Sequence, residues 1–397
     1  MKPLGVRLID LATGLLGNLP IRRMPLRVEP LLDRAVGNTG LDDFGDPAFR
    51  EPLTRLVDGM REEGRLTPMG RLAAHGLILG ALVERLKIVD EVKRAPDLAS
   101  PSFQPLVVAG LYRSGTTFLH HLLGAMPSVH GPTFGELRSP VRASQVGGRE
   151  EAIRIARRVV KIHRYLSPGA DTIHPIAADE PDECLHLLEN SFWTTTSTFI
   201  SDSTSFAKWI GENDAGPAYR FYRSQLGLLA RRVETERWAL KWPMHLWWLD
   251  TLLETLPRAR VVVLERDPAR VVPSTCSLNV CTRTSFSPVD DPHRLGAFWL
   301  DYLARGRERQ ERVLATASPD RIRRLDYEAF VANPISTVQD LADWMGWALS
   351  DEDRQAVRAR VGKPRYRGKP SATHRYTAED YGLTDGGIRE RMGWNAR

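Results

Sequence analysis

The segment from residue 105 to residue 126 constrains the fold more than any other part of this sequence. An apolar run over 105–111 predicts a buried strand, and 118–126 follows with the pattern of a helix. Gly110 and Gly115 bound the turn between them. A strand, a tight turn and a helix N-terminus together direct backbone N–H groups and the positive end of a helix dipole toward one point. The segment therefore predicts an anion cradle suited to phosphate or sulfate.

The turn differs from the phosphate-binding loop of ordinary ATPases. That motif has lysine directly after its second glycine, where the side chain reaches the terminal phosphates of a nucleotide. In this chain Thr116 occupies that position, and the only cation of the turn is Arg113, two residues before Gly115. We therefore expect the turn to bind a phosphate-like group without forming an ordinary ATPase site.

Beyond residue 100, short strand-like runs alternate with amphipathic helices. The predicted pairs are 105–111 with 118–126, 237–241 with 245–256, 259–265 with 268–278, and 322–326 with 328–346. This alternation predicts an α/β, P-loop-like three-layer fold with a central parallel sheet flanked by helices. In such sheets ligands lie outside the carboxyl ends of the strands, where Arg113, Lys241 and Arg266 fall. Three cations at three strand ends predict one site.

The chain is predicted to consist of a helical N-terminal extension, 1–100, packed on a main domain, 101–397. Within the extension, a helical period is visible over 49–60 and again over 68–92. Within the main domain, the segment 131–235 lacks clear strand signals and is predicted to be a helical insert. Its aromatic residues either cover an acceptor pocket or belong to the ordinary core: Phe192, Trp193, Phe199, Phe206, Trp209, Tyr219, Phe221 and Tyr222.

Composition limits the partners and the compartment. The 55 basic and 49 acidic residues leave a net charge of +6, which is too small an excess to require nucleic acid as a partner. Cys184, Cys276 and Cys281 have neither zinc-site spacing nor a disulfide pattern, which predicts packing roles and a reducing, cytoplasmic location. Charges interrupt the apolar residues at the start of the chain, so a secretory signal is not expected. No uncharged apolar run long enough for a membrane span is present in the sequence.

Two helical segments leave peripheral membrane contact open. Residues 4–17 have an amphipathic pattern that would lie either on a membrane or on the protein itself. Residues 151–166 carry a basic stripe that either docks an anionic acceptor or membrane or is a solvated face. The stripe comprises Arg154, Arg157, Arg158 and Lys161.

Three segments, in the same order, resemble the sulfotransferases that use 3′-phosphoadenosine-5′-phosphosulfate (PAPS), above all their bacterial branch and the tyrosylprotein sulfotransferases. The turn 110–117 is similar to the family's 5′-phosphosulfate loop, in which a basic residue precedes Ser-Gly-Thr-Thr. Arg266 and Ser274 are similar to its 3′-phosphate segment, and 241–243 to its Lys-x-Pro element. Weaker similarities at 326–328 and 374–383 extend the resemblance over about 100–385.

The resemblance implies an enzyme that moves a sulfuryl group from PAPS to a hydroxyl-bearing acceptor and releases adenosine 3′,5′-bisphosphate. Arg113 and Lys241 are expected to draw negative charge toward the leaving 5′-phosphate, and backbone N–H groups and hydroxyls to hold its oxygens. Such chemistry requires positioning and charge rather than a metal. The residues expected to bind PAPS are Arg113, Ser114, Gly115, Thr116, Thr117, Arg266 and Ser274, with Arg367 or Lys369 from the basic tail.

Glu136 is the first candidate for the general base. It lies in Gly-Glu-Leu-Arg, similar to the Gly-Glu-…-Arg segment of the tyrosylprotein sulfotransferases, although this chain has one glutamate where they have two. His245 is the rival, because other sulfotransferases use histidine and this one closely follows Lys241. The structural alternatives are an ion pair for Glu136 and a capping or packing role for His245. An acidic cluster either lines the acceptor site or forms a solvated face: Asp179, Glu180, Asp182 and Glu183, with His174 nearby.

Two other functions stay open at this point. A P-loop-type nucleotide phosphotransferase would share the cradle, but Thr116 and the absence of a clear Mg²⁺-binding carboxylate motif count against it. A non-catalytic PAPS-binding protein would need neither a base nor a second cation, and both Glu136 and Lys241 are present. The acceptor itself, whether a small-molecule, lipid or glycan hydroxyl, is not determined, because acceptor pockets are built from variable inserts.

Overall fold

A four-stranded parallel sheet lies at the centre of the molecule, which we describe from a computed structural model over residues 25–96, 102–167, 175–363 and 376–394, together with Pro3 and Val6. The strands run in the order β2-β1-β3-β4. They are β1 (Gln104–Gly110), β2 (Arg237–Lys241), β3 (Arg260–Glu265) and β4 (Ile322–Asp326). The predicted strands and the parallel α/β fold are confirmed. The register aligns Val108 with Lys241 and Glu265 with Asp326, so the carboxyl ends of all four strands meet at one edge.

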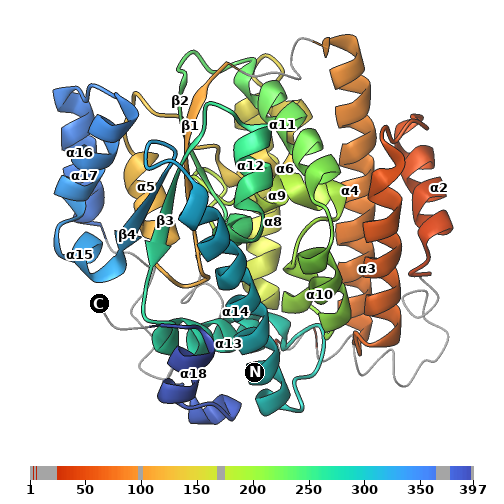
Figure 1. Cartoon of the computed structure of the whole chain (residues 1–397). Helices are drawn as coiled ribbons and strands as arrows, with labels where there is room; N and C mark the ends of the chain where they lie inside the picture. The colour runs from red at the N-terminus through yellow and green to blue at the C-terminus, as the bar shows by residue number, and fades with distance from the viewer. Residues whose placement is uncertain are drawn as a thin grey trace.

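Both faces of the sheet are buried under helices. Successive side chains point to opposite sides of a strand, so neighbouring residues contribute to different clusters. Val107 and Val263 belong to one apolar cluster and Val108 and Val262 to another. The second cluster is completed by α5 (Thr116–Leu123), α16 (Pro334–Met345) and α17 (Asp351–Val361). On the first face lie η7 (Pro243–Trp248), α12 (Leu249–Thr255) and α14 (Pro292–Thr316). Figure 1 shows these two helical layers on either side of the strands.

Three N-terminal helices stand side by side at one end of the molecule (Figure 1). They are α2 (Val28–Thr39), α3 (Arg50–Glu62, preceded by η2, Pro47–Phe49) and α4 (Pro68–Arg94). The periodic residues Phe49, Leu53, Leu56 and Met60 are all buried, and they share one core cluster with side chains of the sheet. Of the predicted amphipathic segment 4–17, Val6 alone is among the described residues, and its side chain is buried in the same core cluster.

The described part of the segment 131–235 consists of α-helices and 3₁₀ segments. Its elements are α6 (Phe134–Arg138), α7 (Pro140–Ala143), α8 (Gly148–Leu166), α9 (Leu185–Leu188), η5 (Glu189–Ser191), η6 (Thr196–Phe199), α10 (Thr204–Glu212) and α11 (Gly216–Ala230). Most of its aromatic side chains pack in the main core, and of those singled out in the sequence only Phe199 lines the pocket described below.

Helix boundaries differ from the predictions at three places. The predicted helix 328–346 is two helices, α15 (Tyr327–Ala332) and α16, which separate at Asn333 because the residue before a proline disfavours helical dihedrals. The predicted helix 245–256 begins as the 3₁₀ segment η7. The helix after β3, α13 (Pro268–Arg283), continues beyond the predicted end despite Pro273, and η8 (Glu379–Tyr381) and α18 (Asp385–Arg391) follow near the C-terminus.

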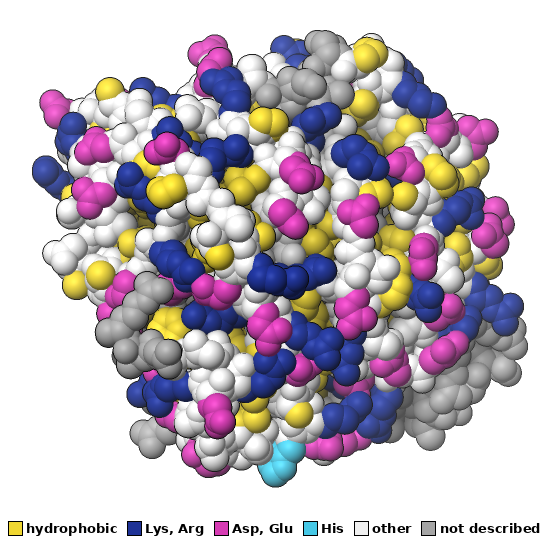
Figure 2. All heavy atoms as spheres, in the orientation of Figure 1, with side chains coloured by type: hydrophobic (Ala, Val, Ile, Leu, Met, Phe, Trp, Pro, Cys, Tyr) yellow, Lys and Arg dark blue, Asp and Glu magenta, His cyan; other side chains and the backbone are white. Residues whose placement is uncertain are grey.

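The surface carries both signs of charge. Figure 2 shows basic and acidic side chains interspersed over one face of the molecule, as the nearly balanced composition predicts. None of the helices in the described ranges combines the length and the apolar character that crossing a bilayer requires.

Candidate active site

The turn after β1 has a backbone that requires both of its glycines. Gly110 and Gly115 have φ values of +149° and +93°. A Cβ atom on Gly115 would lie 2.6 Å from the ring of Tyr327, and one on Gly110 would lie 2.6 Å from the carbonyl oxygen of Leu264. Arg113 between them also has a positive φ, +65°, which is uncommon outside glycine and concentrates at ligand-binding positions. The turn is therefore fixed in shape by its neighbours.

Two contacts hold Arg113 in this conformation. Its guanidinium Nε donates to Ser274 Oγ of α13 at 3.2 Å, and its carbonyl oxygen accepts from Nη1 of Arg266 at 2.8 Å. The sequence predicted that these three residues share one site. The structure brings them together across segments far apart in the chain.

The N-terminus of α5 faces the same site. The hydrogen bonds of this helix begin with Phe118 N–H, which donates to the carbonyl oxygen of Gly115 at 3.0 Å. The N–H groups of Thr116 and Thr117 therefore lie in the first turn, where a helix has no acceptors of its own. Gly115, Thr116 and Thr117 all line the pocket, whereas the Ser114 hydroxyl donates to the carbonyl of Leu111 and fixes the turn instead.

Lys241, at the end of β2, forms a buried ion pair. Its Nζ donates to Glu183 Oε1 at 2.6 Å and to Thr117 Oγ1 at 3.2 Å. The lysine side chain is only 1% exposed, and both of its partners line the pocket. The ammonium group is thus held directly behind the pocket wall, beside the first turn of α5.

Arg266, at the end of β3, presents a cation with unsatisfied hydrogen-bonding capacity. Its guanidinium lies over the ring of Tyr327, 4.1 Å from the centroid, and it lines the pocket. The Nε atom is buried and has no hydrogen-bond partner among the described residues. Because a buried, unpaired donor of a charged group is costly, this arginine is suited to an anionic ligand.

These residues surround one pocket of about 260 Å³ with two chemically different parts. One part is the cationic cradle, to which Arg360 of α17 and Lys363 contribute further positive charge. The other part is largely apolar and is lined by Pro175, Ile176, Leu185, Phe199 and Leu278. Such a pocket can hold an anionic group at one end and an apolar molecule at the other.

The predicted acidic cluster divides between pocket and surface. Asp182 and Glu183 line the pocket, whereas Glu180 pairs with Arg360 at 3.0 Å and Asp179 pairs with Arg157 of α8 at 3.2 Å. His174, Arg367 and Lys369 lie outside the described residues.

Glu136, the first sequence candidate for the base, does not line the pocket. Its Oε2 accepts from the N–H and the hydroxyl of Thr133 at 2.8 and 2.7 Å, which forms a capping box at the start of α6. Its Oε1 lies 3.1 Å from Nε of Arg149 and 3.4 Å from Nε2 of His130. Both carboxylate oxygens are therefore engaged in local structure. Arg138, its neighbour in the sequence, pairs with Glu189 instead.

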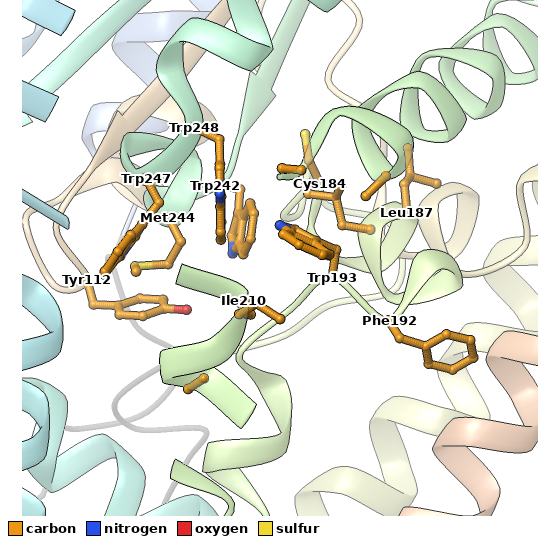
Figure 3. Packing of buried hydrophobic residues seen from close by; sticks show 14 of the residues in the cluster. Tyr112, Cys184, Leu187, Phe192, Trp193, Ile210, Trp242, Met244, Trp247 and Trp248 are labelled. Carbon is orange, nitrogen blue, oxygen red and sulfur yellow. The ribbon is translucent and has the colours of Figure 1, made fainter. Parts of the chain in front are cut away.

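His245, the rival candidate, is fully buried in the aromatic core and does not line the pocket either. Its Nδ1 is 2.7 Å from the hydroxyl of Tyr219, and its ring lies edge-on to that of Trp242. Figure 3 shows the rings of Trp242 and Trp248 gathered in this part of the core. Burial lowers the pKa of His245 to about 3. His245 is therefore a neutral residue that packs in the core.

Several pocket residues were not identified from the sequence. Glu189 is buried, and although burial favours its neutral form, the hydrogen bond from His186 and the charge of Arg138 lower its pKa to about 2. Tyr327 supports both Gly115 and Arg266, and Arg360 arrives from α17. The only sequence signal among them was the strand-to-helix segment 326–328, which contains Tyr327.

Comparison with known proteins agrees with this geometry. The model of a family described as the sulfotransferase family matches residues 105–351, which include the cradle, Lys241, Arg266 and Ser274. Sulfotransferase STF1 from Mycobacterium tuberculosis is 33% identical, with a TM-score of 0.81 over 92% of this chain and 98% of that structure. Sulfotransferase STF9 from Mycobacterium avium, 21% identical, has the same fold, with a TM-score of 0.83 over 93% of this chain and 96% of that structure.

A third relative has a lipid substrate in its name. The omega-hydroxy-beta-dihydromenaquinone-9 sulfotransferase Stf3 of Mycobacterium bovis is 24% identical over 305 residues, which are 73% of this chain and 75% of Stf3. The family match covers more than half of this chain and contains the glycine-bounded cradle with Arg113, Lys241 and Arg266. The chain therefore belongs to the sulfotransferase family, the enzymes that transfer a sulfuryl group.

Proposed function

We propose that the sulfuryl donor is PAPS, that the acceptor bears a hydroxyl group, and that adenosine 3′,5′-bisphosphate is released. The observation that carries this proposal is the convergence of two groups suited to anions on one pocket: the first turn of α5 with Arg113, and Arg266, whose buried Nε has no hydrogen-bond partner within the described ranges. A donor with phosphate at both the 5′ and 3′ positions requires two such groups. An ordinary nucleoside triphosphate would place all of its phosphates in a single anion-binding group.

In this proposal the two groups divide the work. Thr116, Thr117 and Arg113 hold the 5′-phosphosulfate, where backbone N–H groups and a helix dipole favour negative charge. Arg266 holds the 3′-phosphate, and Ser274 keeps Arg113 in place through its hydrogen bond. Lys241 supplies charge from behind Thr117 as the bond to the leaving phosphate breaks.

We propose Glu183, rather than Glu136 or His245, as the general base. Glu183 lines the pocket next to the cradle, and only one of its carboxylate oxygens contacts Lys241. The carboxylate of Glu136 accepts from Thr133, and the ring of His245 contacts the hydroxyl of Tyr219. Neither side chain lines the pocket. A base must lie within hydrogen-bond reach of the acceptor hydroxyl, and Glu183 lines the same pocket as the apolar side chains proposed to hold the acceptor.

An apolar alcohol, such as a lipid carrying a hydroxyl group, fits the acceptor part best. Ile176, Leu185, Phe199 and Leu278 form its wall. Stf3 is named for a hydroxylated menaquinone, which is such a molecule. We also propose a cytoplasmic location, which is supported by the reduced, buried thiols of Cys184 and Cys276.

Adenosine 3′,5′-bisphosphate is expected to raise the unfolding temperature of the protein by several degrees. A ligand at about 100 times its Kd stabilises the native state by about 2.7 kcal/mol. Differential scanning fluorimetry with this ligand, and with ATP and magnesium in parallel, measures the effect. A shift with ATP but not with the bisphosphate would favour a phosphotransferase, and the absence of any shift at saturating bisphosphate would contradict the proposal. A shift without transfer from labelled PAPS to a lipid extract would favour a non-catalytic binding protein.

Replacing Arg266 with alanine is expected to remove the preference for a 3′-phosphate. Loss of a charge-assisted contact costs roughly 10- to 100-fold in affinity for the bisphosphate, with little change for adenosine 5′-monophosphate. Isothermal titration calorimetry with both ligands gives the ratio of affinities. Because Arg266 also supports the carbonyl of Arg113, Arg266→Lys serves as the control that retains the charge. An alanine variant with the wild-type ratio would assign the 3′-phosphate to other residues.

A further inference from the structure

Helix α8 has an exposed face on which an apolar row and a basic row run in parallel. Most of the exposed large hydrophobic side chains in the described part of the chain lie on or next to this helix: Val146, Ile155, Val159, Ile162 and Tyr165, against Leu72 and Ile335 elsewhere. The side chain of Ile162 is 59% exposed, and that of Tyr165 is 54% exposed. A single exposed apolar residue is ordinary, whereas several on one helix mark an interaction surface.

Helical geometry explains the two rows. Ile155, Val159 and Ile162 are spaced four and three residues apart, so they lie above one another on the same face. Each is preceded by a cation, and these cations form the second row: Arg154, Arg158 and Lys161. The side of the helix opposite the basic row is buried through Ala152, Ala156 and Val160, and the apolar row lies between the basic row and this buried side. The exposed rows therefore belong to a helix whose orientation is already fixed by packing.

The basic row is available for an external partner. Arg158 and Lys161 form no ion pair within the described residues, and both are exposed. Arg154 has only a 3.4 Å contact with Glu151. A helix that presents aliphatic side chains beside unpaired cations fits the boundary between lipid headgroups and acyl chains, and the cations favour an anionic surface.

The same helix leads to the pocket. His163, in the last turn of α8, lines the pocket together with Ile176 and Leu185. A bilayer in contact with Ile155, Val159 and Ile162 would thus lie next to the helix that forms part of the acceptor wall. We propose that α8 docks the protein on an anionic lipid bilayer. The evidence for docking is this surface and does not depend on the proposed function. The further step, in which docking brings a lipid acceptor to the pocket, rests on the proposed function.

Co-sedimentation of the full chain with vesicles tests the docking. The protein is expected to bind vesicles of phosphatidylcholine and phosphatidylglycerol in equal parts, to bind vesicles of phosphatidylcholine alone far less, and to lose binding as salt is raised. Arg158→Glu with Lys161→Glu is expected to lower the partition coefficient by at least about 25-fold, since each of the two cations near an anionic surface contributes about five-fold. Ile155→Gln with Ile162→Gln is expected to lower it by about 10-fold or more.

Matched variants elsewhere keep the test specific. Lys208→Glu with Arg312→Glu changes two exposed cations on α10 and α14, and Ile335→Gln changes an exposed isoleucine on α16. These controls are expected to bind vesicles nearly as the wild type does. Wild-type protein that ignores anionic vesicles, or α8 variants that bind them normally, would overturn the proposal. So would α8 variants that change only self-association in analytical ultracentrifugation, because that result would make the face a contact between copies of the chain. Binding of adenosine 3′,5′-bisphosphate, measured in parallel, reports separately on the proposed function.

Discussion

Replacing Lys241 with methionine is expected to lower kcat for sulfuryl transfer by about 10²- to 10³-fold. This is the usual effect of removing one preorganised hydrogen-bond donor that stabilises the charge developing in the transition state. The ammonium group is buried 3.2 Å from Thr117 Oγ1, at the first turn of the helix that forms the cradle. A charge at this depth is weakly screened by water, so its loss is expected to affect turnover more than donor binding. Transfer of label from PAPS into a lipid extract, with the Kd for adenosine 3′,5′-bisphosphate measured separately, distinguishes the two effects.

The ion pair between Lys241 and Glu183 means that the Lys241→Met variant is also expected to lose stability. Removing one partner of a buried pair leaves an uncompensated charge and is typically destabilising by about 3–5 kcal/mol. The double variant Lys241→Met with Glu183→Gln removes both charges and is expected to recover much of that stability without recovering turnover. If the double variant refolds normally and also transfers sulfate at the wild-type rate, Lys241 has no part in the chemistry.

Replacing Glu183 with glutamine is expected to lower kcat by about 10²- to 10⁴-fold, the usual contribution of a general base. The amide retains the shape of the side chain and can still accept a hydrogen bond from Lys241, but it cannot take the proton of the acceptor hydroxyl. The bisphosphate should still bind, because Thr116, Thr117 and Arg266 are unchanged. Single-turnover transfer from labelled PAPS measures the chemical step directly.

Glu136→Gln is the matched control for this experiment. Both oxygens of Glu136 serve the capping box and the contacts with Arg149 and His130, so its replacement is expected to lower thermal stability and leave turnover nearly normal. If instead Glu136→Gln abolishes transfer at unchanged stability while Glu183→Gln is active, the base is Glu136, as the sequence resemblance suggested. The pair of variants thus separates a base from a helix cap.

The sheet and the cradle were predictable because their determinants are local. A buried parallel strand appears as a short apolar run, and the turn at 110–117 favours glycine where its backbone adopts positive φ. Because parallel strands end at one edge, Arg113, Lys241 and Arg266 could be placed near one another without coordinates. The parallel register of β1 with β2 and with β3 agrees with that expectation.

The partners of these residues could not be predicted, because they come from segments distant in the sequence. Glu183 stood in an acidic cluster that was expected either to line the acceptor site or to form a solvated face, and its burial against Lys241, 58 residues further along the chain, was not predicted. Glu136 and His245 each had the right residue type at a suggestive position. Their roles depended on whether their polar atoms were already occupied, by Thr133 in one case and by Tyr219 in the other.

The sequence by itself determined the alternation of strands and helices along the chain, the glycine-bounded turn after the first strand and the three cations at the ends of three strands. Only the tertiary structure decided which carboxylates line the pocket, that Nε of Arg266 is buried without a hydrogen-bond partner among the described residues, and that α8 exposes its apolar row. The physical reason is that backbone geometry and hydrophobic periodicity act over a few residues. Burial, ion pairing and the supply of hydrogen-bond partners are set by whichever distant segments pack against each side chain.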